Sequence, residues 1–142
     1  MTRNWFGVLL ALATLPWGCI SRQDQEALDD LKARKQAREE ILREPNRWVR
    51  IVDIETFNKG IVNDYTQTTA LEFRNTTEFD VYDLKGRITY IHQDGSEMAT
   101  VPFKALGEVP AGESVKLKVE SNEIAGAARD FHARIISIRV RN

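Results

Sequence analysis

The sequence predicts a mainly β protein, an antiparallel β-sandwich preceded by a signal peptide and one charged α-helix. Three observations support this prediction. From residue 47 onward, β-branched and aromatic residues are frequent and turn signals recur at short intervals. Residues 21–44 contain helix-forming residues and neither Gly nor Pro. Residues 5–15 form an uncharged, largely apolar run close to the amino terminus.

The composition is that of an ordinary globular protein. The chain has 142 residues, of which 42% are hydrophobic, and its 20 basic residues nearly balance its 21 acidic residues. This balance gives no electrostatic reason to expect nucleic acid as a partner. The single cysteine, Cys19, excludes an internal disulfide and any zinc site with two or four cysteine ligands.

The first element is an export signal over residues 1–18. Arg3 supplies a positive charge, the apolar run of residues 5–15 follows, and the small residue Gly18 precedes Cys19. This order is typical of a signal peptide. The alternative is an uncleaved inner-membrane anchor over residues 4–21, which are uncharged but close to the minimum length for spanning a bilayer.

The Gly18-Cys19 pair at the end of the apolar run resembles the bacterial lipobox. In that family, the cysteine thiol is alkylated with diacylglycerol and the chain is cleaved just before the cysteine. The resemblance implies cleavage between Gly18 and Cys19 and a membrane anchor through lipid on Cys19. Because Ile20 rather than aspartate follows the cysteine, it also implies the periplasmic face of the outer membrane.

Residues 19–46 are interpreted as the lipidated cysteine and a helical spacer. Acidic Asp24 lies early and basic Arg43 lies late, as the helix dipole favours, and Pro45 ends the run. The heptad that begins at Leu28 is interrupted by basic residues, so no stable coiled coil is expected. Two interpretations remain open. The helix is a solvated spacer, or it docks on a partner through its apolar side chains, which are Leu28, Leu31, Ile41 and Leu42.

Residues 47–142 are predicted to form the sandwich. The expected strands cover residues 48–57, 68–74, 79–93 with a bend near Gly86, 97–106, 114–120 and 131–140. Residues 122–130 are expected to hold a short helical turn. Alternation predicts two inward-facing sets, Leu71 with Phe73 and Ile136 with Ile138 and Val140. The aromatic residues assigned to the core are Trp48, Phe57, Phe73, Phe79, Tyr90, Phe103 and Phe131.

The turns of this region carry a family resemblance. Asn75 opens one turn, Tyr90 ends a long strand, Asp94-Gly95 marks a hairpin, and Pro110-Ala111-Gly112-Glu113 precedes an alternating strand. Over residues 66–120 this order resembles the immunoglobulin-like, FxLYD-type domains of bacterial envelope proteins. The resemblance implies an immunoglobulin-like sandwich that serves in adhesion or scaffolding, with no common catalytic residues.

No catalytic or metal-binding arrangement is recognisable in the sequence. His92 and His132 have no evident third ligand, and the acidic residues Asp80, Asp83, Asp94 and Glu97 lack the spacing of a calcium loop. The motifs of serine hydrolases, zinc proteases and P-loop proteins are absent from the sequence. Asn75-Thr76-Thr77 matches a glycosylation sequon, but bacterial export argues against glycosylation there. We therefore expect no enzyme, no cofactor and no metal.

These observations predict a lipid-anchored cell-envelope lipoprotein with a structural or protein-binding role. It would act as an accessory subunit of an envelope assembly, and an exposed strand edge could recruit its protein partner. The alternative is a periplasmic carrier of a small ligand or metal, with polar groups around His92 and Asp94 or His132 at one end of the sandwich.

Overall fold

The computed structural model describes residues 21–59, 65–120 and 124–141. The predicted signal peptide and the junction of Gly18 and Cys19 lie outside the described residues. The chain divides into two compact units, residues 1–33 and 34–142. The second unit therefore begins earlier than residue 47, where the composition changes.

The predicted charged helix is confirmed as α1 (Arg22–Arg43). Its first turn is closed by Ser21, whose hydroxyl oxygen accepts the backbone N–H of Asp24 at 3.1 Å and donates to the Asp24 carboxylate at 2.6 Å. This reciprocal arrangement satisfies a backbone donor that has no partner within the helix. Pro45 begins the short helix α2 (Pro45–Trp48), where its fixed backbone angle suits the first helical position.

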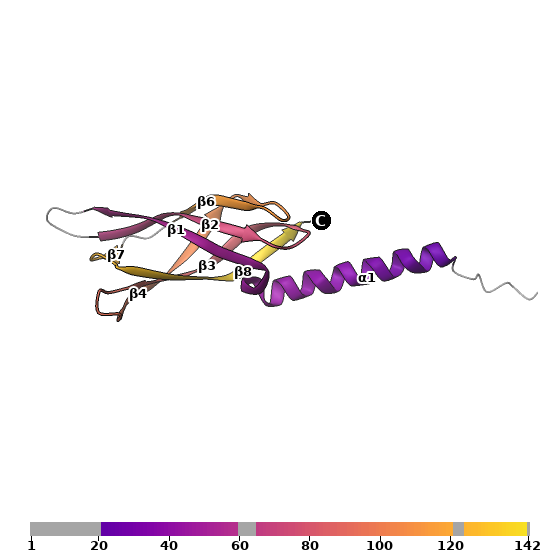
Figure 1. Ribbon diagram of the computed structural model, residues 1–142, viewed down its shortest axis with the longest axis horizontal. Helices are drawn as coiled ribbons and strands as arrows, with labels where there is room; N and C mark the ends of the chain where they lie inside the picture. The colour runs from indigo at the N-terminus through magenta and orange to yellow at the C-terminus, as the bar shows by residue number, and fades with distance from the viewer. Residues whose placement is uncertain (1–20, 60–64, 121–123, 142) are drawn as a thin grey trace, which may run out of the picture. The chain divides into compact units, whose positions relative to one another are not determined.

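The mainly β, antiparallel fold class is also confirmed (Figure 1). The strands are β1 (Val49–Lys59), β2 (Tyr65–Asn75), β3 (Asp80–Ile91), β4 (Glu97–Leu106), β5 (Glu108–Val109), β6 (Ser114–Glu120), β7 (Ile124–Ala125) and β8 (Asp130–Arg141). One layer contains β1, β2 and β6, and the other contains β4, β3 and β8. The layers are continuous because β4 also pairs with β6, so the sandwich is one curled sheet.

The core lies between the two layers. Its largest fully buried side chains include Tyr90, Phe73 and Leu71, so the predicted inward face of Leu71 and Phe73 is confirmed. Tyr90 packs edge-to-face against Phe131, with ring centroids 5.4 Å apart. Its hydroxyl lies 2.9 Å from the hydroxyl of Thr68, which gives each buried polar group a partner.

The predicted inward face of the last strand is wrong at one residue. Ile138 and Val140 are buried, but Ile136 is 50% exposed and Ile135 takes the inward position. The cause is a register shift, since Ser137 pairs with Lys85 and Ile135 pairs with Gly86 on β3. Ile136 is the extra residue of this β-bulge, which resets the alternation of side chains.

Gly86 lies opposite this bulge, and the bend predicted there coincides with the register shift in β3. A Cβ atom at Gly86 would collide with the backbone oxygen of Arg134 and lie 2.6 Å from the ring of Phe103. The close approach of β3 to β8 therefore requires glycine at this position.

Two further sequence predictions are wrong. Phe57 is 51% exposed, because the register shift between Ile51 and Asp53 changes the alternation of β1. Phe57 therefore pairs with Gln67, on the face opposite to the buried Thr66 and Thr68. Residues 124–130 contain no helical turn; Ile124 and Ala125 instead form β7, which pairs with Thr66 and Tyr65. The composition of this segment favoured a helical turn, but its pairing with the edge of β2 produces a short strand instead.

Candidate binding surfaces

The four apolar residues assigned to helix docking do not form one surface. Ile41 is 3% exposed and belongs to the core of residues 34–142, so it is unavailable to a partner and its assignment is wrong. Leu28, Leu31 and Leu42 are exposed. Their predicted role in binding stays a prediction.

The outer edge of β8 is covered by the segment that precedes β1. Asn46 donates from Nδ2 to the carbonyl of Ile135 at 2.6 Å, and its Oδ1 accepts the backbone N–H of Ile135 at 2.7 Å. Arg38 donates to the carbonyl of Val140 at 2.8 Å. A side-chain amide has the donor and acceptor of a peptide group, so Asn46 replaces a neighbouring strand at Ile135. No sequence signal marked this role.

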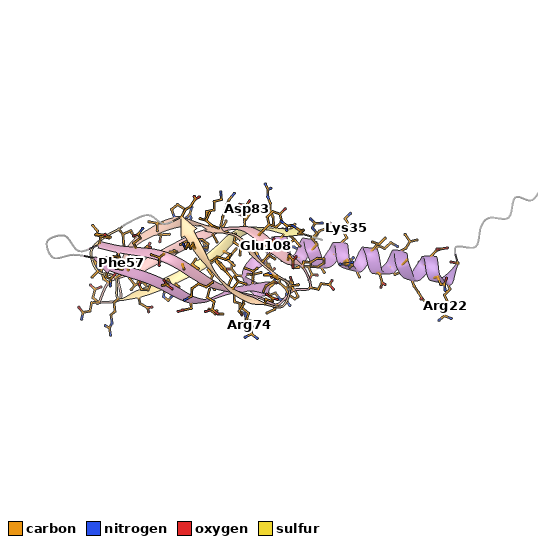
Figure 2. All side chains as sticks on the ribbon, turned by 90° about the horizontal axis from the view of Figure 1, so that it is seen from above. Arg22, Lys35, Phe57, Arg74, Asp83 and Glu108 are labelled. Carbon is orange, nitrogen blue, oxygen red and sulfur yellow. The ribbon has the colours of Figure 1, made fainter. Side chains whose placement is uncertain are left out.

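The outer edge of β1 carries no such cover among the residues that the structure describes. This strand pairs with β2 on one side, and no other described strand pairs with it. Val52 and Phe57 on β1 are each 51% exposed. Phe57 is labelled near the β1–β2 hairpin end of the domain in Figure 2. An unpaired strand edge with exposed apolar side chains is a template for pairing with another chain.

The outer face of the layer formed by β4, β3 and β8 contains two adjoining hollows. The first has a volume of about 390 Å³, and its polar lining residues are Arg87, Thr89, Glu97, Thr100, His132 and Arg134. The second has a volume of about 500 Å³ and shares Arg87 with the first. It reaches Pro102, Phe103 and Ile136, so its lining is more apolar than that of the first hollow. Its charged lining residues besides Arg87 are Lys85, Lys104 and Glu120. The bulge contributes to this hollow because it turns Ile136 outward.

Hydroxyl groups connect the strands inside the first hollow. The hydroxyls of Thr89 and Thr100 lie 2.8 Å apart, and Thr100 also lies 2.7 Å from a carboxylate oxygen of Glu97. Only one of these contacts can use the single proton of the Thr100 hydroxyl. When Thr100 donates to Glu97, it accepts the proton of Thr89, which gives a short chain that ends on the carboxylate.

The structure separates the residues named for the ligand or metal carrier. His132 lines the first hollow and pairs with Thr89, whereas His92 lies beyond the end of β3 and does not line it. Asp94 closes its own turn, accepting the backbone N–H and the hydroxyl of Ser96. These hydrogen bonds lower the pKa of Asp94 because they stabilise its carboxylate. The described residues contain no group of three or more His, Cys, Asp or Glu that could hold a metal.

Asn75 is a structural residue of the turn that the sequence identified. Its side chain is 1% exposed. Its Nδ2 donates to the carbonyls of Phe79, Val109 and Pro110, and its Oδ1 accepts from Thr77. The sequon therefore presents no accessible amide in the folded domain. Asn75 instead joins the start of β3 to the turn before β6.

In the part of the chain that the structure describes, no helix is long and apolar enough to cross a membrane. Comparisons with protein-family models, curated proteins and solved structures gave no match. The lipobox and the immunoglobulin-like, FxLYD-type family therefore remain resemblances of the sequence.

Proposed function

We propose that this protein is a lipid-anchored envelope lipoprotein whose β domain binds a protein partner along the free edge of β1. The anchor part of the proposal rests on Cys19, which follows the apolar run and Gly18. Lipid on Cys19 would hold the protein at the periplasmic face of the outer membrane, as an accessory subunit of an envelope assembly.

One observation carries the binding part, the contrast between the two edges of the curled sheet. The edge of β8 is capped at Ile135 by Asn46, whereas the edge of β1 has no second strand among the described residues. A partner segment in extended conformation would add its backbone hydrogen bonds to β1 and cover Val52 and Phe57. Specificity would come from these two side chains.

Site-specific photo-crosslinking tests the binding surface in cells that express the full chain. Phe57 is replaced with a photoreactive phenylalanine, and the matched control carries the same group at Leu106, which is 49% exposed on β4. We expect a discrete adduct at position 57 that is absent at position 106. V52K should reduce this adduct, because a charged side chain on an edge strand opposes strand addition. Equal adducts at both positions, or an adduct unaffected by V52K, would contradict the proposed edge.

Intact-mass analysis of protein extracted from membranes tests the anchor separately. We expect a chain that begins at Cys19 and carries diacylglycerol on its thiol. C19S should remain unlipidated and keep residues 1–18, and globomycin should cause the same retention in the wild type. A wild-type chain that keeps residues 1–18 and carries no lipid would overturn this part and favour the uncleaved anchor.

A further inference from the structure

Two neighbouring strands of the outer face, β3 and β8, place two arginines directly opposite each other. Arg87 on β3 pairs in register with Arg134 on β8. Directly opposed like charges destabilise a pair of antiparallel strands. Within the described residues neither guanidinium forms an ion pair, although Arg139 on β8 and Lys85 on β3 both contact Asp83. Among the described residues, this particular repulsion is therefore not balanced by an ion pair.

A second pair of opposed arginines, on β1 and β2, serves as a comparison because it does not line a hollow described above. Arg50 on β1 pairs in register with Arg74 on β2, and within the described chain these arginines also lack an ion pair. Arg74 is labelled in Figure 2, where it points away from the domain. None of the hollows described above is lined by Arg50 or Arg74, whereas Arg87 and Arg134 both line the first hollow. The combination of opposed charge and a concave surface occurs at Arg87 and Arg134.

We infer that the hollow at Arg87 and Arg134 binds an oxyanion, a phosphate or carboxylate group, carried on a small organic molecule. Two guanidinium groups provide planar, charged donors that suit the oxygens of such a group. His132 lines the same hollow as Arg134, and its ring N–H can add a third donor. This inference goes beyond the proposed protein-binding role and does not depend on it.

The surrounding groups define how the ligand would lie. Glu97 is the carboxylate of this hollow, and it is engaged by the hydroxyl of Thr100. The anion is therefore expected at the arginine end, away from Glu97. The second hollow continues from Arg87 to Phe103 and Ile136. An apolar substituent of the ligand would lie there, so an organic phosphate should bind more tightly than inorganic phosphate.

Isothermal titration calorimetry of the detergent-solubilised full chain tests the site with inorganic phosphate and phenyl phosphate as probes. We expect saturable binding with one site, and phenyl phosphate should bind more tightly. The double variant R87Q/R134Q should weaken phenyl phosphate binding by about tenfold or more, because both charge-assisted donors are lost. The matched control R50Q/R74Q should bind like the wild type. Similar losses in the two double variants, or binding that does not saturate, would overturn the inference.

Two further variants distinguish loss of the binding site from misfolding of the domain. R134E places a carboxylate opposite Arg87, so it should raise the melting temperature in the absence of phosphate and abolish phenyl phosphate binding. I136S should remove the preference for phenyl phosphate and leave inorganic phosphate binding unchanged, because Ile136 is exposed at the bulge. An R134E protein that still binds phenyl phosphate with wild-type affinity would contradict the site.

Vesicle flotation identifies the source of the oxyanion. The probes are phosphatidylglycerol vesicles and phosphatidylcholine vesicles, added to the full chain with Cys19 replaced by Ser so that no lipid is attached to it. Because this variant keeps the apolar residues 5–15, vesicle binding is scored as the excess on phosphatidylglycerol over phosphatidylcholine. Binding to phosphatidylglycerol that is lost in R87Q/R134Q would assign the site to a lipid headgroup. Phenyl phosphate binding without vesicle binding would assign it to a soluble ligand. Loss of vesicle binding in R50Q/R74Q but not in R87Q/R134Q would overturn the inference.

Discussion

Replacing Asn75 with alanine should destabilise the β domain far more than an ordinary surface substitution. The Asn75 side chain is almost fully buried and has two amide hydrogens for the carbonyls of Phe79, Val109 and Pro110. Its Oδ1 accepts both the backbone N–H and the hydroxyl of Thr77. N75A removes all of these contacts at once and leaves buried backbone groups without partners.

The cost can be estimated from these contacts. Two donated and two accepted hydrogen bonds, at about 1 kcal/mol each, give about 4 kcal/mol. Small domains are stable by about 5–15 kcal/mol in total, so this loss is a large fraction of the whole. N75D should be at least as damaging, because a carboxylate oxygen would replace Nδ2 and face carbonyl oxygens.

Urea unfolding of the full chain in detergent, followed by circular dichroism, measures the loss. The matched control is N58A, which removes an exposed asparagine from β1 and should change the free energy of unfolding by less than about 0.5 kcal/mol. If N75A cost no more than N58A, Asn75 would not join the turns through buried hydrogen bonds. A stable N75D protein would contradict the assigned orientation of the amide.

Two more predictions concern the turns and the bulge. G86A should destabilise the domain by about 3 kcal/mol, because its methyl group meets backbone oxygen that cannot move without disturbing the pairing of β3 with β8. The control G95A has open space around it and should cost only about 1 kcal/mol from its positive φ; equal losses in urea unfolding would refute the steric argument. The lowered pKa of Asp94 means that its carboxylate stabilises the folded state above its unfolded pKa, near 3.8. The stability difference between wild type and D94N should therefore shrink as the pH falls through the folded pKa, and a difference that grows on acidification would contradict the hydrogen bonds from Ser96.

The turns and the strands with alternating apolar residues could be predicted from the sequence. The hairpin at Asp94-Gly95 has a positive φ at Gly95, which glycine adopts without steric cost. The same holds for Gly112 in the turn before β6. The strands Glu97–Leu106 and Ser114–Glu120 begin and end where the pattern placed them. These features are local, so neighbouring residues contain the information that determines them.

The features that could not be predicted are those that depend on contacts between segments far apart in the sequence. Ile136 alternates correctly with Ile138 in the sequence, but the bulge against β3 reverses its direction. Asn46 and Ile135 are far apart in the chain, and no local pattern reveals that the asparagine amide caps the strand edge. The arginines of the candidate oxyanion site show the same limit, because their opposition depends on the register of β3 with β8.

The bulge links the stability of the domain to the shape of its candidate ligand site. Gly86 lets β8 approach β3 closely, and the extra residue Ile136 is then directed outward into the second hollow. The register on one side of the bulge pairs Arg87 with Arg134. On the other side, a second register shift between Tyr82 and Lys85 precedes the pair of Tyr82 with Arg139, whose guanidinium contacts Asp83. A strand without the bulge would shift every residue beyond it to the opposite face. The same backbone irregularity therefore buries Ile138 and Val140 and creates the apolar end of the groove beside the arginine pair.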